Sequence, residues 1–195
     1  MKIDSYKKQQ LVKIGRHEVA HYIIAKKLGF ETGSISLEVT HIPEGHLAGA
    51  EITLFKNLDS IENVTSYIKR RVVILYAGVL GESLEKGIVN EKYACDELNK
   101  GAANDFAKCR ELLQILNNIT SSASSKEEAN ANLQSINNEL WSEAIKLVQE
   151  AQEAIEGLGS RLAFEIDKIG EKVVLENSEI EELPAIKAWL TQNRT

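Results

Sequence analysis

Several residue types and patterns are scarce in this chain, and each shortage argues against a class of protein. Only two of the 195 residues are cysteines, and they form no Cys-x-x-Cys pair, so we expect reduced thiols rather than a disulfide or a cysteine-based metal site. The longest apolar run, near residues 72–81, is far too short to span a membrane. The first residues are polar and charged, unlike those of a signal peptide. We therefore expect a cytoplasmic protein without a membrane span.

Positive charge is also in the minority. Lysine and arginine number 23, against 29 acidic residues, and the net charge is −6. No basic patch with interleaved aromatic residues is evident, so nucleic-acid binding has little support. The length and the ordinary apolar fraction of 43% are typical of a globular chain that can bury a real core.

Only four histidines are present, yet two of them stand four residues apart in the segment His-Glu-Val-Ala-His, residues 17–21. Side chains four apart lie on the same face of a helix, so His17 and His21 can both reach one metal ion. Glu18 can then reach a water molecule on that ion, and zinc lowers the pKa of bound water to about 7. The segment predicts a zinc site that hydrolyses amide bonds, with Glu18 as the base. Taken alone, it would also fit a surface helix that carries two histidines by chance.

The surrounding residues favour a helix whose histidine pair faces inward. Asp4 or Ser5 can cap the start of this helix, and Gly29 can end it. Residues that step by three and four share one helix face, and on this helix they are Ile14, His17, His21, Ile24 and Leu28. We therefore expect the pair to face the interior or a cleft, with Glu18 at the rim of the apolar face.

The rest of the first 116 residues predicts a small sheet followed by helices. Alternating apolar residues predict strands over 34–40 and 50–55, joined through a turn at 43–45 as a hairpin. A capping-box pattern at 59–62 starts a long helix, in which Gly78 would allow another helix to approach closely. Residues 87–101 are expected to form a loop. A further helix opens at Asn104-Asp105, with Asn104 as its cap.

The second part of the chain predicts helices only. Residues 117–126 are polar and serine-rich, so we expect them to be mobile. They would separate a metal-site half, residues 1–116, from a helical half, residues 127–195, within a single domain spanning residues 1–195. Helical spacing predicts three helices there, which run from Glu127 past Ile155, over 158–169 and over 180–191, with a break at 157–159. The first two would form a carboxy-terminal helical pair, and 173–175 is too short to assign. The fold class expected is α+β, mainly α.

Two histidines do not complete a catalytic zinc site, because a third protein ligand is needed beside the position left for water. The extended motif with a third histidine fails, since Ile24 and Lys27 occupy its glycine and histidine positions. His41 and His46 stand in a strand-turn region, where their odd spacing tends to place them apart. Asp105 begins a predicted helix, where the helix dipole stabilises a carboxylate. Residue chemistry alone leaves Asp105 as either a helix-terminal acid or a ligand.

Residues 101–106, Gly-Ala-Ala-Asn-Asp-Phe, resemble the Gly-Ala-x-Asn-Asp-Leu segment of the FtsH-type zinc metalloproteases, which are AAA+ membrane proteases. Similar matches follow the order of that family along nearly the whole chain, at 17–21, 42–49, 75–84 and 175–183. The resemblance implies a zinc-peptidase fold in which His17, His21 and Asp105 bind zinc. It implies that Glu18 is the general base. It also implies an extended polypeptide substrate that lies beside a sheet edge, for which residues 48–55 would provide the strand.

The chain departs from the family pattern at several points. Ala20 replaces the glycine of the family's pentapeptide, and Glu44 replaces the arginine of its Pro-Arg-Gly turn. No Gly-x-x-x-x-Gly-Lys-Ser/Thr phosphate loop occurs, so an ATP-driven unfoldase-protease is not expected of this chain. The resemblance therefore implies a peptidase domain without its own ATPase. It would act on extended or unfolded polypeptides, alone or with a separate ATPase partner, and as a single chain or an oligomer.

Two other classes of protein fit the same sequence. A non-catalytic adaptor or peptide-binding module would keep the fold and could keep the zinc. A helical structural protein would carry the motif by chance and would bind no zinc. The role of Glu82 is open as well, because it could hold a histidine in place or face solvent.

Overall fold

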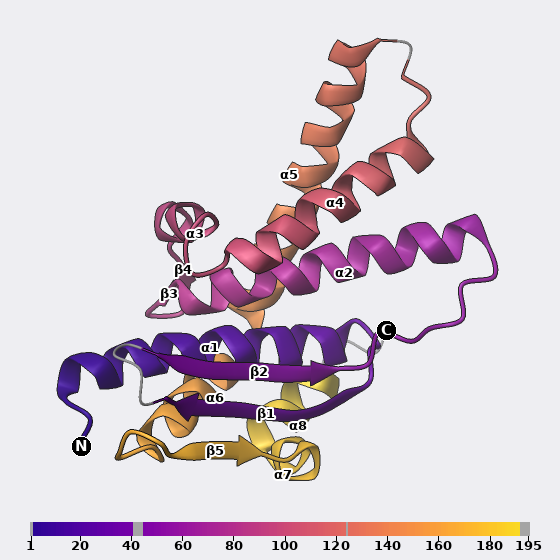
Figure 1. The fold of residues 1–195 in the computed structure, drawn as a ribbon. Coiled ribbons are helices and arrows are strands. Elements are labelled where there is room, and N and C mark those ends of the chain that lie inside the picture. The colour runs from indigo at the N-terminus through magenta and orange to yellow at the C-terminus, as the bar shows by residue number, and fades with distance from the viewer. Residues whose placement is uncertain (1, 41–44, 124, 192–195) are drawn as a thin grey trace.

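The computed structural model describes residues 2–40, 45–123 and 125–191, and helices make up most of it (Figure 1). The helices are α1 (Ser5–Lys27), α2 (Ile61–Glu82), α3 (Glu91–Glu97), α4 (Ala103–Thr120), α5 (Lys126–Glu150), α6 (Gln152–Phe164), α7 (Asn177–Glu182) and α8 (Pro184–Thr191). The strands are β1 (Thr32–Val39), β2 (His46–Ile52) and β5 (Lys172–Leu175) in one sheet, and β3 (Leu84–Glu85) and β4 (Ile88–Val89) in a second. The predicted α+β class, mainly helical with a small sheet, is confirmed.

The larger sheet is antiparallel, with β1 in the centre and β2 and β5 at its two edges. The predicted hairpin is present, since β1 pairs with β2 in a register that places Leu37 opposite Ala48. The second strand runs over 46–52 rather than 50–55, because the chain leaves the sheet after Ile52 and exposes Phe55. The predicted turn falls mostly on residues 41–44, which lie outside the described residues. β2 therefore borders the sheet with one side unpaired among the described strands.

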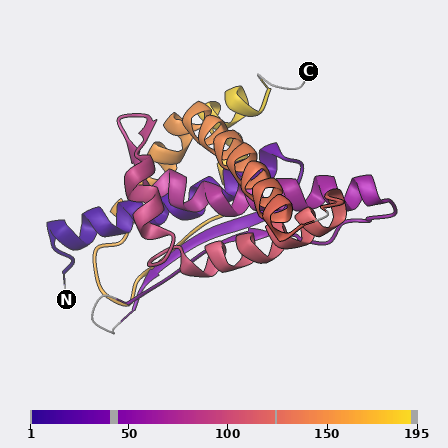
Figure 2. The ribbon, with the colours of Figure 1, turned by 90° about the horizontal axis from the view of Figure 1, so that it is seen from above.

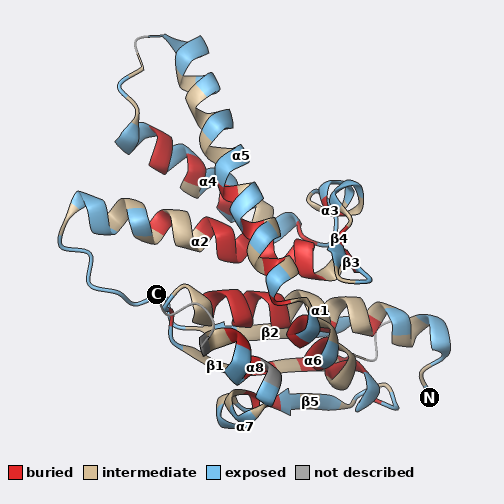
Figure 3. Cartoon of the chain, turned by 180° about the vertical axis from the view of Figure 1, so that it is seen from behind, coloured by how far each residue is buried: buried red, intermediate tan, exposed pale blue. Residues whose placement is uncertain are grey.

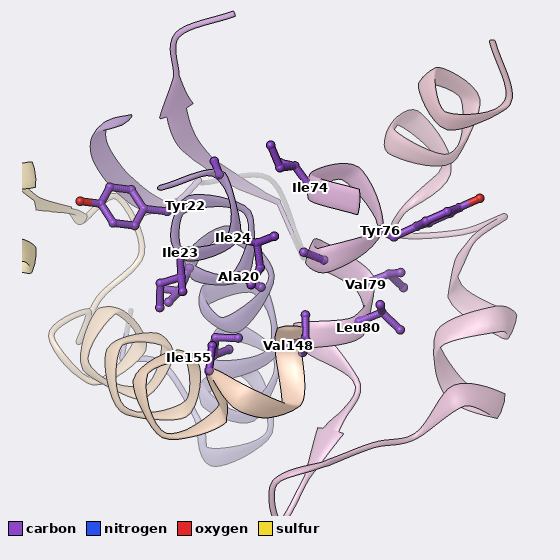
Figure 4. Packing of buried hydrophobic residues seen from close by; sticks show 14 of the residues in the cluster. Ala20, Tyr22, Ile23, Ile24, Ile74, Tyr76, Val79, Leu80, Val148 and Ile155 are labelled. Carbon is purple, nitrogen blue, oxygen red and sulfur yellow. The ribbon is translucent and has the colours of Figure 1, made fainter. Parts of the chain in front are cut away.

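Helix α1 is the centre of the packing, in contact with α2, α6, β1 and β2. Asp4 caps its start by accepting a hydrogen bond from the Lys7 amide at 2.7 Å, and Gly29 follows its end with a φ of +77°. Both predicted boundaries are confirmed. Residues 19–25 are buried on every side, as expected for a helix segment enclosed by other elements. Figures 3 and 4 show this buried segment against α2 and the start of α6.

Glycines allow α1 to approach α6 very closely. A Cβ atom on Gly15 would lie 2.6 Å from the carbonyl oxygen of Gly159, and one on Gly159 would lie 2.7 Å from the Arg16 amide nitrogen. Backbone atoms cannot rotate away as side chains can, so the two helices touch at a point where no side chain fits. This contact fixes α1 against the second part of the chain.

The second part of the chain differs from the prediction in its boundaries. The helix break lies at Ala151, not at 157–159, and α6 runs without interruption through that glycine pair before ending at Phe164. The predicted helix over 180–191 is two helices, because Pro184 holds the preceding Leu183 in an extended conformation and itself suits the first position of α8. Figure 2 shows α5 crossing α2 obliquely, and the two helices are in contact.

The structure also differs from the sequence prediction in two connecting segments. The predicted loop over 87–101 contains α3, whose start is capped by Asn90 accepting from the Tyr93 amide at 3.0 Å. The serine-rich segment is shorter than expected, since α4 continues to Thr120 and α5 begins at Lys126. Its mobility stays a prediction, and residue 124 lies outside the described residues.

The two predicted halves of the chain share one sheet. β5, from the predicted helical half, pairs with β1 from the metal-site half.

None of the helices in the described part of the chain is both long enough and apolar enough to cross a bilayer.

The close approach of α1 to α6 can be tested by comparing alanine substitutions at two glycines of α6. Gly159→Ala should lower the free energy of unfolding by about 1–3 kcal/mol, because its Cβ would overlap the Arg16 backbone. Gly157→Ala, in the same helix, has open space around its Cβ and should raise that free energy by about 0.5–1 kcal/mol through helix propensity. Urea unfolding followed by circular dichroism measures both. Similar changes in the two variants would contradict the close approach.

Candidate metal centre

Three side chains from two helices meet between α1, α2 and the start of α4. His17 and His21 stand one turn apart on α1, and their Nε2 atoms are 3.1 Å from each other. The Asp105 carboxylate comes from the first turn of α4, with Oδ2 at 3.1 Å from the His21 Nε2 and 3.4 Å from the His17 Nε2. Within the described residues these three form the only group found with metal-ligand spacing. The structure thus brings together the three residues predicted as ligands.

Hydrogen bonds to the other ring nitrogens aim both Nε2 atoms at the same point. The Nδ1 atom of His21 lies 2.8 Å from the carbonyl oxygen of Ile74. A carbonyl oxygen can only accept, so Nδ1 carries the hydrogen and a neutral His21 presents its lone pair at Nε2. The Nδ1 atom of His17 faces the Glu82 Oε2 at 3.4 Å in the same way. A ring held by its Nδ1 hydrogen is the usual arrangement for a histidine that binds a metal through Nε2.

The spacing of these donors fits a small four-coordinate ion. Bonds of 2.0–2.1 Å at tetrahedral angles place neighbouring ligand atoms about 3.3–3.4 Å apart. The three observed separations are 3.1, 3.1 and 3.4 Å. Two imidazole nitrogens and one carboxylate oxygen are a ligand set that suits zinc. The Cys109 sulfur is buried against the Val72 carbonyl at 3.9 Å, and Cys95 is exposed on α3, so neither belongs to this group.

Gly78 on α2 makes the room in which the imidazoles sit. A Cβ atom at this position would lie 2.4 Å from the His21 Nε2 and 2.6 Å from the His17 Nε2. The sequence predicted a close approach of another helix here. The groups that approach are the two histidine rings themselves, so any side chain at Gly78 would occupy the place where the ligand atoms converge.

The charges of the site favour a cation among these three side chains. Burial alone would lower the pKa of His17, but hydrogen bonds with Asp105 and Glu82 outweigh it and raise that pKa to about 9. Burial would raise the pKa of Asp105, but its hydrogen bonds with both histidines hold that pKa far below the usual range. In the metal-free protein a proton therefore serves as the cation. A divalent metal would have to displace this proton, so its affinity should rise with pH.

Glu82 supports His17 rather than facing solvent. Burial raises its pKa, but hydrogen bonds with His17 and Tyr93 and nearby positive charge outweigh burial, and the pKa is lowered. Its Oε1 accepts a hydrogen bond from the Tyr93 hydroxyl at 2.7 Å. The Lys13 ammonium lies 4.3 Å from the centre of the Tyr93 ring. The sequence did not indicate a role for Tyr93, because this residue belongs to α3, which lies in the segment expected to be a loop.

The three candidate ligands line a cleft of about 360 Å³ between α1, β2, α2 and the start of α4. Glu18 lines the same cleft, as do three consecutive small residues of β2, Ala48 to Ala50. The cleft therefore unites the candidate ligands, the Glu18 carboxylate and the edge of the sheet where β2 has no partner among the described strands. A larger cavity of about 690 Å³ lies between α3, α4 and α5, but Cys95 is the only histidine, cysteine, aspartate or glutamate in its described lining.

Several residues near the site lie in positions that differ from the sequence prediction. Asn104 does not cap α4, because the helix begins at Ala103 and the cap position is Ala102, two residues before Asn104. Asn104 lies in the first turn and lines the cleft. His46 is the first residue of β2 and is not in the ligand group, and His41 lies outside the described residues. Arg71, which also lines the cleft, was missed, although its spacing from Leu75 on the same helix face could have indicated it.

The role of Gly78 can be tested with two alanine variants of the same cleft. Gly78→Ala should weaken zinc binding at least about tenfold, because its Cβ would overlap both Nε2 atoms. Gly49→Ala lines the cleft from β2 with no atom within 4 Å of its Cβ, so it should bind zinc like the wild type. Competition with a chelator of known affinity measures both. Equal affinities in the two variants would show that Gly78 does not make room for the site.

Comparison with known proteins assigns no family to this arrangement. No protein-family model matches the chain, and no curated protein sequence matches it. The resemblance to FtsH-type peptidases therefore stands on the order of its motifs.

Proposed function

We propose that this chain is a zinc-dependent endopeptidase that hydrolyses peptide bonds of extended or unfolded polypeptides. The observation that carries the proposal is the convergence of two imidazole nitrogens and one carboxylate oxygen, 3.1–3.4 Å apart, in a cleft that also holds Glu18. Three protein ligands are typical of catalytic zinc, where one position stays open, whereas structural zinc is normally closed by four. The FtsH-type resemblance supports the same assignment of ligands.

Each residue would have a separate task in the reaction. His17, His21 and Asp105 would hold the ion. Zinc, when bound, supplies a Lewis acid that polarises a carbonyl and makes water acidic enough to ionise near pH 7. Glu18 would take the proton of the attacking water and deliver it to the nitrogen of the leaving amine. Glu82 would keep the His17 ring oriented.

The free edge of β2 favours an extended substrate. β2 pairs only with β1 among the described strands, and its residues 48–50 line the cleft beside the candidate ligands. A polypeptide in strand conformation could hydrogen-bond to this edge and pass the cleft, as in other cases of strand addition. The small side chains there leave room for its backbone. Folded substrates would have to be unfolded first, which is the task that a separate ATPase partner would perform.

Glu18→Gln tests the proposed chemistry most simply. The amide cannot accept the proton, so hydrolysis of an unfolded protein should fall by about 10²- to 10⁴-fold while the zinc content stays the same. Glu143→Gln, an exposed residue of α5 away from the cleft, makes the same chemical change and should leave hydrolysis unaffected. Fluorescence from a quenched unfolded substrate measures the rates, and metal analysis measures the zinc.

Two results would contradict the proposal. Equal hydrolysis by the wild type and Glu18→Gln would remove Glu18 from the chemistry. Stoichiometric zinc without hydrolysis of any unfolded substrate would instead favour a non-catalytic peptide-binding module.

A further inference from the structure

Arg71 of α2 lines the cleft of the candidate metal centre, half-buried, and has no hydrogen bond or ion pair within the described residues. The other arginines that the structure describes all have a partner. They are Arg16 on the Leu84 carbonyl and Glu156, Arg70 on the Leu28 carbonyl, Arg110 on the Phe106 ring, and Arg161 on Glu165 and Glu179. Charged groups that leave water are normally paired, because desolvation without a partner costs free energy. An unpaired guanidinium in a cleft is therefore available for a ligand.

The carboxylates that share the cleft leave Arg71 unsatisfied. Asp105 is engaged by the two histidines, and its second oxygen, Oδ1, accepts a bond from Lys108 at 3.2 Å. Glu18 lines the same cleft, and no ion pair joins it to Arg71 among the described residues. Apart from the two histidines, the cleft thus carries two cationic side chains, Arg71 and Lys108, against the two carboxylates of Glu18 and Asp105. With a divalent ion in place its net charge is positive, on a chain whose overall charge is −6.

The position of Arg71 on α2 gives its distance from the candidate metal centre. Arg71, Leu75 and Gly78 are spaced by four and three residues, so they follow one face of the helix. Seven residues at 1.5 Å each place Arg71 about 10 Å from Gly78, which touches both histidine rings. An extended polypeptide advances about 3.3 Å per residue. A group on such a chain would meet Arg71 about three residues from the bond at the metal.

We infer that Arg71 is a carboxylate-binding subsite of the cleft, which favours polypeptides with a carboxylate about three residues from the scissile bond. The inference rests on the proposed function. A guanidinium matches a carboxylate in a bidentate geometry that few other groups can use, which makes it the most specific partner for such a group. The carboxylate could belong to an aspartate or glutamate side chain or to the carboxy-terminus of the substrate.

The test uses peptides that differ only in Glu or Gln at each position from three before to three after the scissile bond. Each peptide is made with a free and with an amidated carboxy-terminus. The ratio of kcat/KM for Glu over Gln is measured for wild type, Arg71→Gln and Arg70→Gln. The last variant makes the same change one residue away, outside the described lining of the cleft. Binding of the same peptides to the zinc-loaded Glu18→Gln protein, with and without Arg71→Gln, is followed by fluorescence anisotropy.

The expected result is a preference for Glu of about tenfold or more at one position, in hydrolysis and in binding. Arg71→Gln should reduce that ratio to about one, and Arg70→Gln should retain it. A preference for Glu that persists in amidated peptides identifies an acidic side chain as the ligand. A preference for free over amidated peptides of the same sequence, lost in Arg71→Gln, would identify the carboxy-terminus instead.

Other results separate the two proposals. Hydrolysis in which the Glu-to-Gln ratio and the free-to-amidated ratio are both near one throughout would overturn the subsite and leave the peptidase intact. So would hydrolysis in which neither ratio changes in Arg71→Gln. A binding preference lost in Arg71→Gln, without hydrolysis by the wild type, would support the subsite and contradict the peptidase. Failure to bind or cut any peptide would contradict both.

Discussion

The lack of a side chain at Gly78 governs the arrangement of the candidate site, because it lets two imidazole rings of α1 lie directly against the backbone of α2. The Nε2 atoms could not approach within 3.1 Å of each other beside a larger residue, since a Cβ there would overlap both. The same close packing lets the Ile74 carbonyl fix the His21 ring. Helix packing and ligand geometry are therefore one constraint. The contact of α1 with α6 through Gly15 and Gly159 secures the opposite side of the same helix.

The charges of the site, like its packing, favour a bound cation. The three side chains combine two lone pairs and a negative charge in a partly buried place, which is unfavourable unless a cation joins them. In the absence of metal a proton on His17 fills that role, as its raised pKa indicates. The Glu82 carboxylate stabilises positive charge on the same ring, and Tyr93 holds Glu82 in turn. The site is thus prepared for positive charge by groups from α1, α2, α3 and α4.

Features encoded by neighbouring residues could be predicted from the sequence. The caps and ends of α1, its inward histidine pair and the β1–β2 hairpin follow from local spacing and turn chemistry, and they were found. Asp105 could be called a ligand only through the family resemblance, because its position at a helix start has an equally good local explanation. The convergence of the three predicted ligands supports that assignment, while their binding of zinc stays a prediction.

Features that depend on distant contacts could not be predicted. β5 is a strand because it pairs with β1, more than 130 residues earlier in the chain. α6 continues through Gly159, where local propensity suggested a break, because that glycine packs against the Arg16 backbone. Tyr93 contacts Glu82 only because α3 packs beside the site. In each case tertiary packing outweighs local preference.

The most direct test of the account is X-ray absorption at the zinc edge on the zinc-loaded protein, compared with Asp105→Ala. We expect one zinc per chain with only nitrogen and oxygen neighbours at about 2.0–2.1 Å, including two imidazoles, and a changed first shell in the variant. Sulfur scattering at about 2.3 Å, an identical spectrum in the variant, or no zinc at stoichiometric level would contradict it.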